Sequence, residues 1–423
     1  MGPRIIEAAD LRLGEFIRPG DTVVCGQTAA EPLTLTQALV EQRADLSGAR
    51  VFLGAVFSRT FAPEHADHLR FSSYGVLGAA AALGRQGLID VLPCSYHELE
   101  CRYASGALAA DVVLLQLAPG GGDGPYSLGM ANDYVAAAAR RARVVIAEVH
   151  PDVPWTHGAA WPRDARIDVV VPATRPPLDM AAAACGPVEE AIGRHVAALI
   201  PDGAVLQTGI GAIPDAVLAA LRSHRDLGLH SGMAGDRMVE LIEAGVVTNA
   251  RKPFDAGIGV VNVLAGTAST RRHAHRNPAL IVRPARYTHA QAVLSTLHAL
   301  HAINSALQVD LGGQVNSEML GGVPMGGIGG LNDFVRGARA APGGRSIIAL
   351  PSTARSGAVS RIVARLDDAV VTVPRCDADL VVTEWGVADL RACTLAERAR
   401  RLTAVAAPQF RESLEKAWRG ARQ

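Results

Sequence analysis

The stretch AVLQTGIGAIPDAVLAALRSHRDLGLHSGMAGD, residues 204–236, carries the clearest signal for the fold. Ala204 to Thr208 is a short apolar run of strand length, which Gly209, Gly211 and Pro214 interrupt before apolar residues recur at helical spacing. The pattern predicts a strand, a glycine turn and a helix. The N-terminus of such a helix exposes backbone N–H groups that can bind a phosphate or a polarised carbonyl oxygen. A purely structural turn is an equal alternative, because tight turns need glycine for steric reasons.

A second copy of this unit lies earlier in the chain. Pro19 to Leu39, PGDTVVCGQTAAEPLTLTQAL, aligns without gaps on Pro201 to Leu221, and Pro32 falls on Pro214. Two strand-turn-helix units of this kind indicate a duplicated domain. We therefore expect an active site between the two copies, where ligand sites preferentially occur.

The rest of the chain alternates strand and helix patterns. Asp111 to Leu117 and Val144 to Val149 are almost wholly apolar, as expected of parallel strands buried on both faces. Alanine-rich helical segments separate such runs, so the fold class is α/β, with two tandem, similar open sheets covered by helices. The proline-rich segment from Asp152 to Pro187 predicts the crossover, giving domains at 1–187 and 188–423. A further strand is expected at Val370 to Val373.

Composition excludes several classes of partner. The chain has 41 basic and 41 acidic residues and no basic run with interleaved aromatics, so neither nucleic acid nor an anionic membrane is an expected partner. No apolar run has signal-peptide or membrane-spanning length. The six cysteines contain no C-x-x-C pair, which suits a reducing, cytoplasmic location. The H-x-H pair in Arg271 to Asn277 is expected to lie in a solvated loop, and no metal is expected.

Two other features are candidates for the site. His150 follows the predicted strand at Val144 to Val149, where a histidine can act as a general base or serve as a structural hydrogen-bonding residue. The segment from Gly321 to Ala338 contains seven glycines in eighteen residues. Glycine buries no side chain, so this loop is expected to let a ligand or another loop approach the backbone closely.

Taken together and in this order, the motifs closely resemble those of the acetyl-CoA hydrolase and CoA-transferase family, which includes acetate and 4-hydroxybutyrate CoA-transferases. The resemblance covers nearly the whole chain. It implies the CoA-transferase-like fold in both domains, an interdomain active site, acyl-CoA as substrate and a homodimer or higher homo-oligomer. The matching segments include AEP (30–32), AEV (147–149), LQTGIGAIPDAVL (206–218), INSALQVDLGGQV (303–315), GGIGG (326–330), IIALPSTA (347–354) and VVTEWGVADL (381–390).

One departure from the family pattern changes the expected chemistry. In the family a glutamate within an H-[ST]-E-M segment attacks the acyl-CoA and then carries CoA as a thioester. Here the segment is His230, Ser231, Gly232, Met233. Glycine has no carboxylate, so the covalent relay through this position is lost. Other differences accompany it, such as His150 in place of the family's asparagine and Leu331 in place of its glutamine.

The resemblance also implies which groups still hold the thioester. Asn304 is expected to donate its amide to the thioester oxygen, with His150 or His230 as general base and Gly232 leaving space for the acceptor. Backbone groups in two glycine segments are expected to bind CoA, and each oxyanion donor can contribute about 3 kcal/mol. These segments are Gly209, Ile210, Gly211 and Ala212, and Gly327, Ile328, Gly329 and Gly330.

The leading hypothesis is an enzyme that transfers an acyl group directly from CoA to a non-carboxylate acceptor, either a small molecule or a carrier-protein thiol. Three alternatives stay open at this point. They are thioester hydrolysis by water, CoA transfer through a relocated carboxylate, and a non-catalytic acyl-CoA-binding paralogue.

Overall fold

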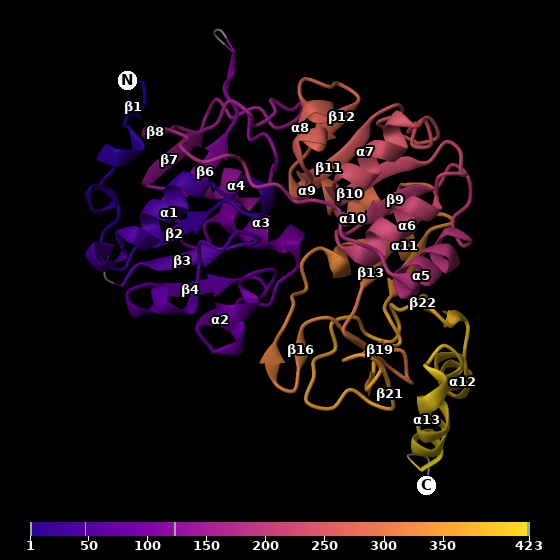
Figure 1. Ribbon diagram of the computed structural model, residues 1–423. Helices are drawn as coiled ribbons and strands as arrows, with labels where there is room; N and C mark the ends of the chain where they lie inside the picture. Colours follow the sequence, from indigo (N-terminus) through magenta and orange to yellow (C-terminus); the bar gives the residue numbers. More distant parts are fainter. Residues whose placement is uncertain (1, 47, 122–123, 421–423) are drawn as a thin grey trace. The chain divides into compact units, whose positions relative to one another are not determined.

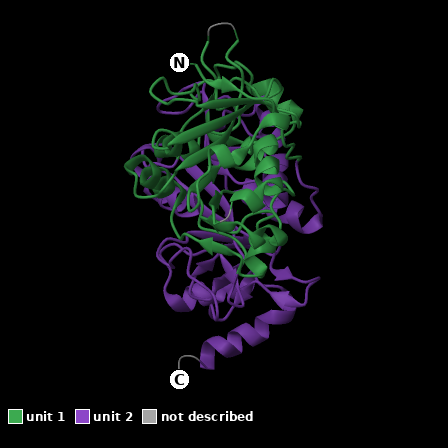
Figure 2. Ribbon diagram, turned by 90° about the vertical axis from the view of Figure 1, so that its left-hand side faces the viewer, with its two compact units in different colours: residues 1–181, 260–288, 324–329 green, residues 182–259, 289–323, 330–423 purple. Residues whose placement is uncertain are grey.

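The computed structural model describes residues 2–46, 48–121 and 124–420. The chain forms two compact units, which are coloured separately in Figure 2. Unit 1 comprises residues 1–181, 260–288 and 324–329, and unit 2 comprises residues 182–259, 289–323 and 330–423. The predicted boundary after residue 187 lies close to the end of the first segment. That 1–187 and 188–423 are separate domains stays a prediction.

Unit 1 is built on a parallel sheet with the strand order β1-β8-β7-β6-β2-β3-β4-β5 (Figure 1). Every residue of its strand β6 is buried, as the apolar run at 111–117 predicted. The bounds of the strands are β1 (Arg4–Ile5), β2 (Thr22–Cys25), β3 (Arg50–Leu53), β4 (Arg70–Ser73), β5 (Ile89–Val91), β6 (Val112–Leu117), β7 (Val144–Val149) and β8 (Val169–Pro172).

Some helices in unit 1 begin at side-chain caps. The Asp133 carboxylate accepts a hydrogen bond of 3.0 Å from the Val135 N–H at the start of α4. The α-helices are α1 (Leu33–Glu41), α2 (Ala81–Arg85), α3 (Tyr96–Ser105), α4 (Tyr134–Ala139), α8 (Ala268–Ala274) and α9 (Ala285–Thr288), with 3-10 turns η1 (Ala8–Asp10), η2 (Leu13–Glu15), η3 (Thr28–Ala30), η4 (Arg43–Leu46) and η5 (Pro63–Asp67). Strands β11 (Gly259–Leu264) and β12 (Leu280–Val282) are neighbours.

In unit 2 the main strands follow the order β10-β9-β13-β18-β22-β23, parallel except for the last pair. The bounds of these strands are β9 (Val205–Thr208), β10 (Gly228–Ala234), β13 (Leu300–Ser305), β18 (Arg345–Ala349), β22 (Leu380–Thr383) and β23 (Gly386–Asp389). The α-helices are α5 (Pro187–Ala197), α6 (Ala212–Ala220), α7 (Asp236–Glu243), α10 (Gln291–Leu294), α11 (Leu331–Ala340), α12 (Leu395–Ala404) and α13 (Pro408–Gly420).

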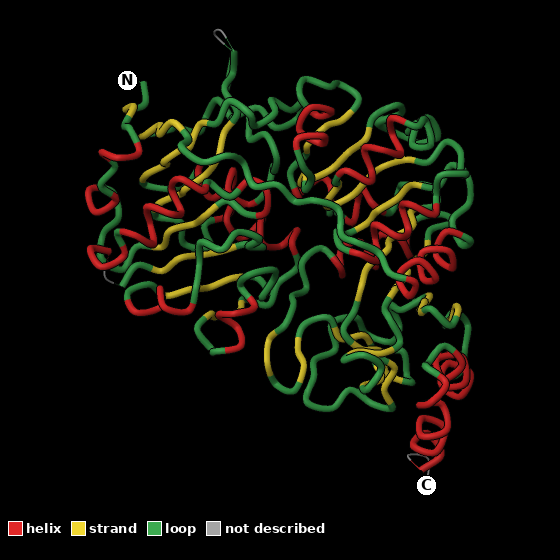
Figure 3. The backbone as a smooth tube through the Cα atoms, viewed as in Figure 1, coloured by secondary structure: helices red, strands yellow, loops and turns green. Residues whose placement is uncertain are grey.

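Short strands interrupt the long connections of the second half. The segment between β18 and β22 is mostly loop, as Figure 3 shows. These strands are β14 (Gln308–Asp310), β15 (Val315–Asn316) and β21 (Ile362–Val363) in one small sheet, and the pairs β16 (Met319–Leu320) with β17 (Val323–Pro324) and β19 (Thr353–Ala354) with β20 (Val359–Ser360).

The two units repeat one strand arrangement, which confirms the predicted duplication. Neighbours β3-β2-β6-β7-β8 of unit 1 correspond in chain order to β10-β9-β13-β18-β22 of unit 2. In unit 1 the strands that follow β2 are added on its β3 side, and β6 then pairs with the other side of β2. In unit 2, β10 pairs with one side of β9, and β13 pairs with the other. The resulting switch points lie between β2 and β6 and between β9 and β13, and ligands of open α/β sheets bind outside the carboxyl ends of the strands at such points.

Two local predictions are wrong. Val370 to Val373 is not a regular strand, because it has no neighbouring strand along its length and only Val373 makes an isolated bridge, with Val315. Arg271 to Asn277 is not a simple loop. Most of it belongs to helix α8, which Thr267 caps by accepting a hydrogen bond of 3.3 Å from the Ser269 N–H.

Within the described ranges, we find no helix whose length and hydropathy would let it cross a lipid bilayer.

Helices α5 and α6 approach each other closely at Gly193. A Cβ atom at this position would lie 2.6 Å from the Ala216 carbonyl oxygen, which is backbone and cannot turn away. Although alanine is the better helix former, we expect Gly193→Ala to destabilise the protein by about 1–3 kcal/mol. Urea unfolding measures the effect. Gly420→Ala, at a helical glycine with open space around it, is the matched control, and equal stability of the two variants would contradict the prediction.

Candidate active site

The switch point of unit 2 brings several predicted site residues together. Ile303 of β13 pairs with Thr208 of β9, so Asn304 and Gly209 both lie at the carboxyl ends of these strands. On the other side of β9, the Thr208 N–H donates to Ser231 Oγ at 3.2 Å, and Ser231 Oγ donates to the Thr208 carbonyl at 2.9 Å. These bonds hold Ser231 beside Thr208, so Gly232 of β10 lies close to the carboxyl end of β9.

Asn304 is held by a partner that the sequence did not suggest. Its Nδ2 donates to Gln207 Oε1 at 3.0 Å, and Gln207 Nε2 donates to Asn304 Oδ1 at 3.3 Å. The reciprocal amide pair fixes the orientation of Asn304. Among the described residues only one of the two Nδ2 protons is engaged, so the other can donate to a ligand such as a thioester oxygen.

The space beside Gly232 is filled by His289, which sequence reasoning missed. A Cβ atom at Gly232 would lie 3.0 Å from His289 Nε2 and 3.3 Å from the Phe334 ring. A Cβ atom at Gly330 would lie only 2.7 Å from the same imidazole. His289 is buried, with its ring centroid 4.7 Å from that of Phe334. The glycine at 232 therefore lies against a histidine ring, and the expectation that it leaves space for an acceptor stays a prediction.

His230 lies two residues before Gly232 on the same strand, so its side chain points to the same face of the sheet. Its side chain is fully buried, with 0% of its surface exposed. In this conformation His230 lies beneath the site and has no surface for direct contact with a substrate.

The first predicted CoA-binding segment has the expected geometry. Gly211 has a φ of 115° and precedes helix α6, whose N-terminus has no side-chain cap. A Cβ atom at Gly211 would meet no other atom within 4 Å. Open space beside uncapped N–H groups fits close approach by a thioester or by pantetheine. The groups that would hold CoA here are the backbone atoms of Gly209, Ile210, Gly211 and Ala212.

The second predicted segment, Gly327, Ile328, Gly329 and Gly330, is tied to unit 1 at its start. The Val76 N–H donates to the Gly326 carbonyl at 2.8 Å, and the Tyr96 N–H donates to the Gly329 carbonyl at 2.9 Å. A Cβ atom at Gly327 would lie 2.8 Å from the Gly75 Cα, so both positions require glycine. A Cβ atom at Gly329 would meet nothing within 4 Å, which leaves room for a ligand.

His150 has a well-defined structural role in unit 1. Its Nδ1 accepts a hydrogen bond of 3.0 Å from the Asp152 N–H, and the ring also makes a hydrogen bond with the Arg175 backbone. Burial lowers the pKa of His150, so the neutral ring is favoured. Because Nδ1 already accepts the Asp152 N–H, its lone pair is engaged by the backbone.

A buried acidic cluster surrounds the switch point of unit 1. The Glu31 side chain accepts hydrogen bonds at Oε1 from Ser58 Oγ at 2.9 Å and from Thr36 Oγ1 at 3.0 Å. Among the described residues no hydrogen bond reaches its Oε2. Gln116 Nε2 lies 3.4 Å from Glu148 Oε1, and Glu148 Oε2 accepts a bond of 2.6 Å from the Thr34 N–H at the start of α1. Burial, with a smaller contribution from the nearby Glu148, raises the pKa of Glu31 to about 7.

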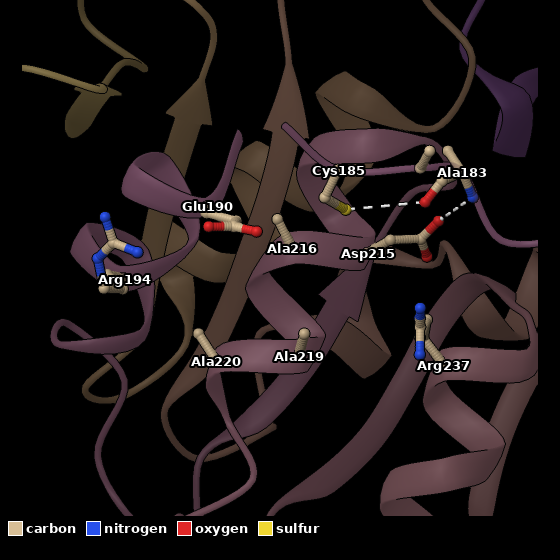
Figure 4. Close-up of a pocket in the computed structure, with 10 residues that line it drawn as sticks. Ala183, Cys185, Glu190, Arg194, Asp215, Ala216, Ala219, Ala220 and Arg237 are labelled. Atoms are coloured by element: carbon tan, nitrogen blue, oxygen red, sulfur yellow. Dashed lines mark hydrogen bonds between the residues drawn. The ribbon is translucent and has the colours of Figure 1, made fainter. Parts of the chain in front are cut away.

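A pocket of about 460 Å³ lies beside helix α6 in unit 2 (Figure 4). The Asp215 carboxylate in its wall accepts a hydrogen bond of 2.8 Å from the Ala183 N–H, and Cys185 Sγ donates to the Ala212 carbonyl at 3.3 Å. The pocket therefore ties the linker before α5 to the turn that begins α6. Its arginines, Arg194 and Arg237, are balanced by Glu190 and Asp215, so its charge favours no class of ligand.

Within the part of the chain that the structure describes, no three His, Cys, Asp or Glu side chains are placed to hold a metal ion.

Comparison with known proteins identifies the family. The model of the acetyl-CoA hydrolase/transferase N-terminal domain matches residues 5–170, and that of the C-terminal domain matches residues 266–418. The chain belongs to the acetyl-CoA hydrolase/transferase family. The resemblance seen in the motifs is thereby confirmed.

Similar proteins cover almost the whole chain. The 4-hydroxybutyrate coenzyme A transferase of Clostridium kluyveri is 40% identical over 93% of this chain and 92% of its own length. The succinyl-CoA:cyclohexane-1-carboxylate CoA transferase of Geobacter metallireducens is 32% identical over 95% and 92%. The crystal structure of RipA from Yersinia pestis is 33% identical, with a TM-score of 0.91 over 99% of this chain and 98% of that one. These comparisons confirm the two-domain α/β fold.

The raised pKa of Glu31 predicts a pH-dependent stability. Between its ordinary pKa of 4.5 and about 7 the unfolded chain releases a proton that the folded chain keeps, so the free energy of unfolding falls as pH rises through this range. We expect Glu31→Gln to remove this fall in the free energy of unfolding, which is on the order of 3 kcal/mol. Urea unfolding from pH 4 to 8 measures it, with Glu64→Gln at an exposed site as control. An unchanged pH slope in Glu31→Gln would contradict the prediction.

The contact between Gly232 and His289 predicts the outcome of restoring the family's glutamate. Gly232→Glu is expected to lower stability by about 1–3 kcal/mol, because the new Cβ atom would lie 3.0 Å from His289 Nε2 and the buried imidazole would have to shift. It is expected to form no enzyme thioester that hydroxylamine or borohydride traps. Adding His289→Ala should recover part of the stability, and Gly14→Glu, at an open glycine, is the control. A stable Gly232→Glu variant that forms the thioester would contradict this.

Proposed function

We propose that this family member uses an acyl-CoA thioester as substrate and transfers the acyl group directly to an acceptor that is not a carboxylate. The acceptor is an amine, a hydroxyl or a carrier-protein thiol. One observation carries the proposal: the place of the family's glutamate is taken by Gly232 with the His289 ring packed against it. An imidazole can remove a proton from an acceptor but does not provide the carboxylate on which the CoA relay depends.

The site contains groups suited to polarising the thioester. The free amide proton of Asn304 and the N–H groups of the turn before α6 lie at the same edge of the sheet. Such donors stabilise the oxyanion that forms when the carbonyl carbon is attacked, at about 3 kcal/mol for each well-placed donor. The Gln207 amide keeps Asn304 oriented before substrate binds, so no reorganisation is needed during the reaction.

His289 is our candidate for the general base. The acceptor's X–H group attacks the carbonyl carbon while His289 Nε2 takes its proton. The C–S bond then breaks, and the protonated imidazole returns the proton to the CoA thiolate, giving acyl-X and free CoA. We assign this role to His289 because its Nε2 lies next to Gly232, 3.0 Å from where a Cβ atom at that position would be.

Hydrolysis is the second candidate, and the same contact favours it. Because His289 fills the space against Gly232, a small acceptor such as water fits beside the ring more easily than a large one. By likeness to the family we also propose a homodimer or higher homo-oligomer. We also propose a cytoplasmic location, because the six cysteines contain no C-x-x-C pair.

The test measures CoA release from a panel of acyl-CoAs with and without amine, alcohol, thiol and carboxylate acceptors, and identifies the acyl product by mass spectrometry. We expect release to depend on a non-carboxylate acceptor. His289→Gln should slow release about 100-fold or more, and Asn304→Ala by a similar factor. His298→Gln, at an exposed histidine nearby, is the matched control and should leave the rate unchanged.

Each other outcome selects a different function. Release without any acceptor, yielding the free acid, would establish hydrolysis. A trappable enzyme thioester in the natural sequence would establish CoA transfer through a relocated carboxylate. Tight CoA binding with no release under any condition would identify a non-catalytic acyl-CoA-binding protein.

A further inference from the structure

Unit 1 contains a polar cavity of about 380 Å³ that shares no residue with the candidate active site. Its walls come from helices α3, α4 and α9, from the segment after β12 and from loops near residues 130 and 160. Three arginines line it. The polar residues that matter for its chemistry are Glu100, Asn132, Arg140, Arg283, Arg286 and Tyr287.

The charges in this cavity are not balanced. Arg286 pairs with Glu100 at 3.6 Å, and Arg140 pairs outside the cavity with Asp164, whose side chain is 70% exposed, at 3.2 Å. Exposed pairs of that kind contribute little and exchange readily with a ligand. Burial also raises the pKa of Glu100, which favours its neutral form. The cavity therefore carries excess positive charge.

Arg283 is the group least satisfied by the protein. Among the described residues no carboxylate forms an ion pair with it, and its Nε atom is buried without a hydrogen-bond partner. A desolvated guanidinium N–H without an acceptor is unfavourable, so a negatively charged ligand in the cavity that Arg283 lines would offset part of that cost.

The backbone and ring contacts of Arg283 hold it ready for such a ligand. Its N–H donates to the Val261 carbonyl at 2.7 Å, and its carbonyl accepts from Asn262 Nδ2 at 2.9 Å. The guanidinium lies 4.7 Å from the centroid of the Tyr287 ring, a cation–π contact that fixes its plane. A preorganised guanidinium loses little freedom on binding an anion.

We propose that this cavity binds the phosphate group of a small molecule. Three guanidinium groups around one cavity match a phosphate, whose several oxygens each accept charge-assisted hydrogen bonds, better than a single carboxylate with two oxygens. The cavity volume exceeds that of phosphate alone, which favours a phosphate ester over the free ion.

Isothermal titration of the full-length protein at low ionic strength tests the proposal, with inorganic phosphate, pyrophosphate and adenosine 3′,5′-bisphosphate as probes and succinate as the carboxylate comparison. We expect saturable binding of phosphate-bearing probes, tighter for the ester than for inorganic phosphate. Binding tighter for inorganic phosphate would overturn the assignment to an ester. Binding tightest for succinate, or no saturable binding of any phosphate probe, would overturn the site.

Variants locate the binding. Arg283→Met should weaken the affinity at least about tenfold, since it removes a guanidinium held for the ligand. Arg365→Met, at a side chain 83% exposed and paired with Asp367, is the matched control and should bind as the natural protein does. Should Arg283→Met fail to fold by circular dichroism, Arg286→Gln, whose side chain is 54% exposed, gives the same test. Unchanged affinity in the folded variant would overturn the proposal.

Discussion

Parallel pairing of buried strands is the constraint on which the candidate site depends. When neighbouring strands run in one direction, all their carboxyl ends meet at one edge of the sheet, and residues far apart in the chain become neighbours there. Ile303 and Thr208 are paired across β13 and β9 for this reason, which places Asn304 beside Gly209. The same arrangement in unit 1 places Glu31 near Gln116 and Glu148. Each unit therefore concentrates polar groups at its switch point.

At the carboxyl edge of the unit 2 sheet, Gly232 lies against the ring of His289. His289 is buried against two glycines. A Cβ atom at Gly330 would lie 2.7 Å from its ring, and one at Gly232 would make a tight contact of 3.0 Å with its Nε2. A larger residue at either position would therefore require the ring, 57 positions from Gly232 in sequence, to shift. Asn304 and the open glycine turn before α6 lie at the same edge of the sheet. Under the proposed function, these groups would hold the thioester carbonyl although position 232 has no carboxylate.

Much of the fold was predictable, because it is encoded in local patterns. The apolar run at Val144–Val149 is a strand with those bounds, since full burial of a parallel strand leaves a continuous apolar signal. The strand β10 was less visible because glycine, histidine and serine interrupt it. His289 could not be assigned to the site, because its partners Gly232 and Phe334 are brought to it only by tertiary folding. Glycine at positions 232 and 330 is compatible with a bulky neighbour, but the sequence does not identify that neighbour.

The interleaving of the two units along the chain affects how the protein is made. Unit 1 takes most of its mass from the first 181 residues, but β12, α8, α9 and most of β11 arrive with residues 260–288, and the loop that meets Gly75 arrives with residues 324–329. A nascent chain leaving the ribosome exposes an incomplete first unit until more than three quarters of the sequence has been translated. During that interval the surface that these later segments cover is open to chaperones, and a chain truncated near the middle lacks the later segments of unit 1.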